Sequence, residues 1–184
     1  MRNEKNSSKE LLLKLCISGM FAALICVATM MIRIPLPLCG YVNFGDCFIL
    51  VAAWILGPVY GFAAGGIGSA FADLFSGYAQ YVPGTFVIKG LIAVAAALIA
   101  RAFLCKSEKL RFSGYVVGGI VGEIVMVGGY YLYESTALGV GFAAAFDSVL
   151  GNTVQGAFGV ALSVVLAQVI AKTKILKKFR AYAV

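Results

Sequence analysis

The chain has 184 residues, of which 61% are hydrophobic and only 12% are charged, and its mean hydropathy is +0.95. A soluble domain is about 45–50% apolar and about 25% charged, and one of this size could not bury so much apolar surface. The composition therefore excludes an ordinary soluble protein. It predicts an all-α, polytopic membrane protein with a single membrane domain over residues 1–184.

Basic residues outnumber acidic ones by fifteen to eight, which gives a net charge of +7. All but two of them lie in three clusters where hydrophobic runs end: Arg2, Lys5, Lys9 and Lys14; Arg101, Lys106, Lys109 and Arg111; and Lys172, Lys174, Lys177, Lys178 and Arg180. This is the pattern of cytoplasmic loops. It disfavours nucleic-acid binding, because no aromatic or base-reading side chains are interleaved with these residues.

The chain has no histidine, and its five cysteines show no metal-ligand spacing. We therefore expect no metal site, no cofactor and no His-based catalysis. Cys39 and Cys47 could lie on the same outer side and form a bridge, although small buried thiols are the favoured interpretation.

The N-terminal region predicts a polar cytoplasmic tail over residues 1–10, followed by a first helix over residues 11–32. That helix of about 22 residues is about 33 Å long, enough to cross the hydrocarbon core. Ser18 with Ala22, and Gly19 with Ala23, form two overlapping small-xxx-small pairs. Such pairs let a second helix approach closely, and that helix could belong to the same bundle or to a partner.

The next apolar run covers residues 44–77 and is too long for one crossing. Gly57-Pro58 predicts a turn between a short second helix and a third that starts near Val59. Residues 33–43, with two prolines and a glycine, predict an ordered outer loop. The remaining segments are a fourth helix over 84–104, a basic inner loop over 105–113, a fifth helix over 114–133, an outer segment over 135–147, a sixth helix over 148–171 and a cytoplasmic tail over 172–184. Six crossings place both termini in the cytoplasm.

Charged groups at membrane depth are costly and are therefore candidates for function. Asp73 and Lys89 are predicted at similar depth with opposite charge, so we expect a structural ion pair, with ligand contact as the alternative. Glu123, Tyr130 and Glu134 share one helical face, as do Asn152 and Gln155. The polar groups gather in the outer half, together with Asn43, Asp46, Gln80, Tyr81 and Thr85. This asymmetry predicts an outward-facing pocket for a small, ring-bearing, hydrogen-bonding solute, whereas a channel needs polar groups along its whole depth.

Several motifs resemble the membrane S components of energy-coupling factor (ECF) vitamin transporters, in the branch for pyridoxine, hydroxymethylpyrimidine or riboflavin-type substrates. They are Val42-Asn43-Phe44-Gly45-Asp46, Leu56-Gly57-Pro58-Val59-Tyr60-Gly61, Gly68-Ser69-Ala70-Phe71-Ala72-Asp73-Leu74, Thr85-Phe86-Val87-Ile88-Lys89-Gly90 and Asn152-Thr153-Val154-Gln155-Gly156. The resemblance implies a six-helix subunit of the bacterial plasma membrane that captures a vitamin from outside. It implies no catalysis by this chain, because a coupling membrane protein and two ATPase subunits would drive transport.

The resemblance also implies a set of functional residues. Substrate contacts would come from Lys89, Glu123, Tyr130, Asn152 and Gln155, near Tyr81 and Thr85, with Tyr41 and Asn43 as a lid. The coupling protein would contact the first helix at Ser18 and Ala22 or at Gly19 and Ala23.

Two other functions fit the residues less well. A self-sufficient carrier or channel would use Asp73 and Glu123 as proton or ion sites, and it would transport solute without an ATPase. An integral-membrane enzyme would use Asp46, Asp73 or Glu123 as acid and base, but these residues are not clustered at one predicted depth.

Overall fold

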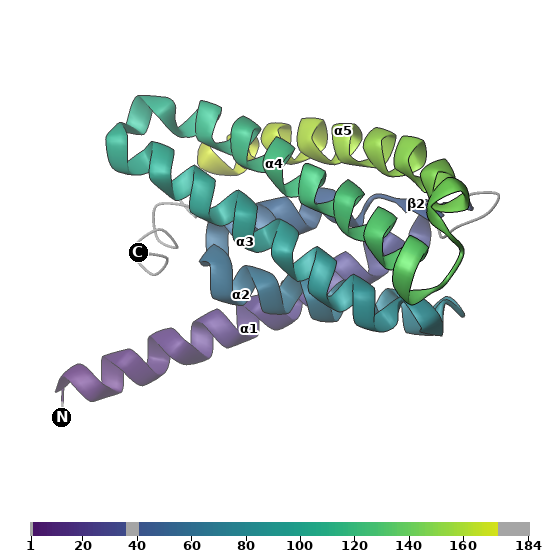
Figure 1. Cartoon of the computed structure of the whole chain (residues 1–184). Coiled ribbons are helices and arrows are strands. Elements are labelled where there is room, and N and C mark those ends of the chain that lie inside the picture. Colours follow the sequence, from purple (N-terminus) through teal and green to yellow (C-terminus); the bar gives the residue numbers. More distant parts are fainter. Residues whose placement is uncertain (1, 36–40, 173–184) are drawn as a thin grey trace.

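The computed structural model describes residues 2–35 and 41–172 and is almost entirely helical (Figure 1). Its helices are α1 (Arg2–Met31), α2 (Gly45–Phe75), α3 (Val82–Lys106), α4 (Arg111–Leu132) and α5 (Phe142–Lys172). Five helices among the described residues are long and apolar enough to cross a membrane. The all-helical fold is therefore as predicted, whereas six separate helices are not found.

The difference in helix number arises within α2, which folds back on itself at Gly57. That residue has φ of 80° and ψ of −177°, a backbone conformation that favours glycine, and the following Pro58 lacks an N–H for the helical ladder. A Cβ added to Gly61 would lie 3.0 Å from the Cα of Ala53, and one added to Gly65 would lie 3.1 Å from Ile49. Since these partners lie symmetrically about Gly57, the two halves of α2 pack against each other as antiparallel helices.

Two segments differ from the prediction in kind. Residues 33–43 include an antiparallel pair of strands, β1 (Arg33–Pro35) and β2 (Tyr41–Asn43), with Arg33 opposite Asn43. The first helix begins earlier than the predicted residue 11, because residues 2–10 are helical and contain neither proline nor glycine to prevent it. Cys39, of the suggested bridge, and residues 173–184, of the predicted tail, lie outside the described residues.

The ends of the bundle differ in composition. One end carries the N-terminal end of α1, the turn at Gly57, the short helix η2 (Glu108–Leu110) and the end of α5, and we call it the basic end (Figure 1). The opposite end, which we call the hairpin end, carries the two strands, η1 (Ala79–Tyr81) and the π-helical turn η3 (Tyr133–Ala137). The basic cluster from Arg101 to Arg111 lies at the first of these, as the sequence predicts for loops on one side of a membrane.

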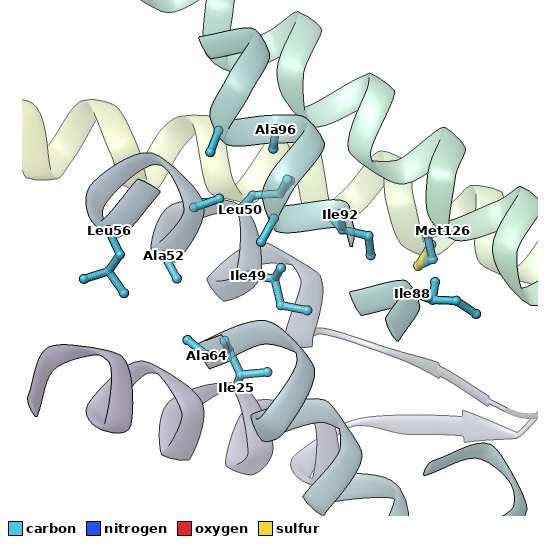
Figure 2. Packing of buried hydrophobic residues seen from close by; sticks show 13 residues of the cluster. Ile25, Ile49, Leu50, Ala52, Leu56, Ala64, Ile88, Ile92, Ala96 and Met126 are labelled. Atoms are coloured by element: carbon cyan, nitrogen blue, oxygen red, sulfur yellow. The ribbon is translucent and has the colours of Figure 1, made fainter. Parts of the chain in front are cut away.

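The apolar core fills the middle of the bundle and draws on α1, α2, α3 and α4 (Figure 2). Ile25, Ile49, Leu50, Ile92 and Met126 have no exposed surface. Along α3 the buried side chains change in character, with Thr85 and Lys89 toward the hairpin end and Ile92, Ala96 and Ala100 toward the basic end. The apolar core therefore fills the bundle between the polar region at the hairpin end and the basic end.

Candidate functional site

A small polar cavity of about 30 Å³ lies at the hairpin end of the bundle. Side chains from all five helices, β2 and the short helices η1 and η3 surround it: Thr29, Tyr41, Asn43, Ser69, Asp73, Tyr81, Thr85, Lys89, Tyr130, Glu134, Asn152 and Gln155. This is room for one or two water molecules, so a larger solute requires the wall to move.

Strand β2 lines the cavity and is held by hydrogen bonds to two different helices. The Tyr41 hydroxyl donates to Oδ1 of Asp73 on α2 at 2.5 Å, and the Asn43 N–H donates to Oε1 of Gln155 on α5 at 2.6 Å. Burial of the Tyr41 hydroxyl, together with the neighbouring Asp73 carboxylate, raises the pKa of Tyr41. Tyr41 therefore remains a protonated donor, and the two hydrogen bonds hold β2 against α2 and α5 beside the cavity.

The buried ion pair of the site joins Lys89 to Asp46, with Nζ and Oδ1 2.5 Å apart and the side chains 2% and 1% exposed. The predicted pair between Lys89 and Asp73 is therefore wrong. The first half of α2 brings Asp46 beside α3, while Oδ1 of Asp73 accepts the Tyr41 hydroxyl. Gln155 Nε2 donates to the second oxygen of Asp46, so this carboxylate is bonded at both oxygens.

Further hydroxyl and carboxyl groups that line the cavity lie close to one another. Thr85 Oγ1 and the Tyr130 hydroxyl lie 2.9 Å apart, and the Tyr81 hydroxyl donates to Oε1 of Glu134 at 3.2 Å. The Lys89 ammonium lies 5.5 Å from the Tyr130 ring centroid. Stacking surfaces and hydrogen-bonding groups in one enclosure can bind a polar aromatic ring.

The structure brings together eight of the nine residues predicted to contact substrate: Tyr41, Asn43, Tyr81, Thr85, Lys89, Tyr130, Asn152 and Gln155. Glu123 is the exception, because it lines a separate groove of about 810 Å³ between α4 and α5. It is 5% exposed, its two carboxyl oxygens have no hydrogen-bond partner, and Gly156 packs against it. The rest of this groove is apolar apart from Thr153.

Thr29 and Ser69 also line the cavity, although the sequence analysis did not select them. Ser69 lies one helical turn before Asp73 on α2, and this spacing places both side chains on one face of the helix. The spacing could have identified Ser69, but the many small residues of the same segment indicated helix packing instead. Thr29 carried no such signal, because only the packing of α1 against α2 brings it to the cavity.

The two small-residue pairs of α1 point in different directions. Ser18 is buried, and a Cβ added to Gly68 of α2 would overlap the carbonyl oxygen of Ala22. The prediction of a partner contact at Ser18 and Ala22 is therefore wrong, since this face packs within the bundle. Gly19 and Ala23 are exposed, and a Cβ added to Gly19 would meet nothing within 4 Å.

Comparison with known proteins places this architecture among membrane transport subunits. A family described as ECF-type riboflavin transporter, S component, matches residues 11–172. A Pyrococcus woesei protein, described as an uncharacterised protein in the gap 3′ region, is 36% identical over 140 residues, which are 72% of this chain and 90% of that protein. A solved S component of a bacterial ECF transporter superposes with a TM-score of 0.65 at 23% identity, over 88% of this chain and 97% of that one. The last likeness concerns the fold alone.

Proposed function

The chain belongs to the family of S components of ECF-type riboflavin transporters, membrane proteins that act as substrate-binding transport subunits, and we propose that it captures a small heteroaromatic vitamin or precursor from outside the cell. Compounds of the pyridoxine or hydroxymethylpyrimidine type are the favoured substrates. Transport would be driven by a coupling membrane protein and two ATPase subunits.

One observation carries the proposal: the polar cavity is covered by β2 and bounded beneath by the apolar core. Such a cavity suits a solute that enters from the hairpin end and is held there, because the fully buried Ile49, Leu50 and Ile92 fill the bundle beyond it. Its volume of about 30 Å³ favours a single ring over a fused three-ring system, since a single ring needs less displacement of the wall.

Orientation and partner contact follow as parts of the same proposal. The basic end would face the cytoplasm, in accord with the positive-inside rule, and the hairpin end would face outward. The two halves of α2 would then count as two of six crossings, with both termini inside. Gly19 and Ala23, on the exposed face of α1, would be the contact for the coupling protein.

The direct test is to purify the full-length protein in mild detergent and identify co-purifying small molecules by native mass spectrometry. Equilibrium binding of pyridoxine, 4-amino-5-hydroxymethyl-2-methylpyrimidine and riboflavin would follow. We expect one of the two single-ring compounds to bind at a 1:1 ratio. Trp54, the one tryptophan, stacks on Tyr115 toward the basic end, so calorimetry is a better readout than fluorescence.

Uptake assays separate this proposal from the self-sufficient carrier. Vesicles that contain this chain alone should bind the ligand without accumulating it, and accumulation should require the coupling protein, both ATPases and ATP. Accumulation by the chain alone would contradict the proposal and would favour a carrier that uses Asp73 and Glu123 as ion sites.

A further inference from the structure

We propose that Thr29, Ser69 and Asp73 form an acceptor subsite within the cavity, and that this subsite selects substrates whose aromatic ring carries an amino group. The inference rests on the proposed function, because it concerns the same cavity. It goes further by stating which chemical class the cavity selects and which residues select it.

The first step is the set of buried oxygens that lack partners. Thr29 Oγ1, Ser69 Oγ and Asp73 Oδ2 have no hydrogen-bond partner, and their residues are 3%, 1% and 4% exposed. All three residues line the cavity. Because a buried polar atom without a partner is costly, three such atoms on residues that line one cavity indicate a group that a ligand can satisfy.

The second step is the charge of the wall. Among the described side chains that line the cavity, Lys89 is the only cation, and its ammonium is bound to Asp46. Glu134 accepts hydroxyl groups at both oxygens, from Tyr81 and from Ser148. Asp73 differs, because Tyr41 satisfies only its Oδ1. The remaining oxygen needs a donor, and an anionic group there would be repelled.

An amino group on an aromatic ring meets these requirements. It offers two N–H donors in the plane of the ring, one for the Asp73 carboxylate and one for a neighbouring hydroxyl, and the hydroxyls of Thr29 and Ser69 can accept. The ring itself would lie against Tyr81 and Tyr130, whose centroids are 6.4 Å apart. Phosphorylated or carboxylated forms of the same ring would bind less well, because their negative charge would be repelled by the Asp73 carboxylate.

The test uses two compounds that differ in one group. Titration calorimetry of the purified full-length protein would compare 4-amino-5-hydroxymethyl-2-methylpyrimidine with its 4-hydroxy analogue. We expect the amino compound to bind at least about tenfold more tightly, since its amino group offers two N–H donors where the 4-hydroxy group offers at most one. In the Asp73→Asn variant the ratio should fall below about threefold.

Two further variants keep the test decisive. Tyr41→Phe removes the hydroxyl that contacts Asp73 but keeps the carboxylate, so it should retain the preference for the amino compound. Ser69→Ala should reduce the preference even if Asp73→Asn does not fold. Equal binding of the two pyrimidines, or an unchanged ratio in both Asp73→Asn and Ser69→Ala, would overturn this inference alone. Failure of both pyrimidines, pyridoxine and riboflavin to bind would instead contradict the proposed function.

Discussion

Two hollows among the described residues differ in size and chemistry, since one is small and polar and the other is large and apolar. The cavity at the hairpin end measures about 30 Å³ and is lined by polar side chains from every helix. The groove between α4 and α5 measures about 810 Å³, but its lining is apolar apart from Glu123 and Thr153. In a bilayer a lateral apolar groove can be filled by acyl chains, whereas an enclosed polar cavity requires a polar occupant.

The difference is the reason why the proposed binding site is placed where polar groups converge and not where the volume is largest. Groups that are far apart in sequence meet at the cavity, such as Asn43 with Gln155 and Lys89 with Asp46. At the groove the Glu123 carboxyl group has no hydrogen-bond partner. The following substitutions test whether changes at the cavity reduce stability and ligand affinity more than changes at the groove.

The largest effect is expected from Lys89→Met, which leaves the Asp46 carboxylate buried without its cation. The free energy of unfolding should fall by about 3–5 kcal/mol, measured by denaturant titration in detergent. Adding Asp46→Asn should restore most of the loss, while adding Asp73→Asn should not. Equal rescue by both second substitutions would contradict the observed pairing.

A smaller effect is expected from Gly68→Ala, because the added methyl group would overlap the backbone of Ala22. The cost should be about 1–3 kcal/mol, seen as a lower thermal midpoint. Gly128→Ala is the matched control in the groove, where a Cβ would meet nothing within 4 Å. This control should be neutral or more stable by up to about 1 kcal/mol, and a large loss there would show that the groove is tightly packed.

Neighbouring residues of α5 allow a direct test of ligand binding, since Asn152 lines the cavity and Thr153 lines the groove. Asn152→Ala should weaken binding of the co-purifying vitamin at least about tenfold while expression stays normal. Thr153→Ala should change the affinity less than about twofold, because the Thr153 hydroxyl bonds to Val149 of its own helix. Normal binding by the Asn152 variant would remove α5 from the site.

The smallest effect is expected from Glu123→Gln. Because Glu123 lies in the groove and its oxygens have no partner, ligand affinity should stay within about threefold of the parent value. The stability should be unchanged or raised by about 1 kcal/mol, since a buried carboxyl without partners is replaced by an uncharged amide. A loss of affinity comparable to that of Asn152→Ala would return Glu123 to the binding site.

Much of the fold could be predicted because lipid imposes simple requirements. Long apolar runs must become helices, and the glycine and proline at residues 57 and 58 must interrupt one of them. The strands β1 and β2 could not be predicted, because each is three residues long and because β2 is held by hydrogen bonds to α2 and α5. The start of α1 at Arg2 was not predicted, because the helix was placed only over the apolar run that begins at residue 11.

Most residues of the candidate site could be predicted from the sequence, but the ion pair and the hydrogen bonds between them could not. Polar side chains at membrane depth must turn toward the interior of the bundle, so their gathering follows from the pattern alone. Which carboxylate Lys89 would bind depends on how the first half of α2 is placed, and that placement results from the reversal at Gly57. Equal depth in the membrane did not identify the partner of Lys89, because two residues at the same depth can lie on different sides of the bundle.

The amino-acid sequence by itself determined that this chain lies in a membrane as packed helices and collects its polar groups toward one end. Only the tertiary structure decided that Asp46, and not Asp73, neutralises Lys89, that Glu123 belongs to a lateral groove, and that Thr29 and Ser69 reach the cavity. The physical reason is that hydropathy is a property of single segments, whereas an ion pair or a cavity wall depends on the rotation and register of several helices at once.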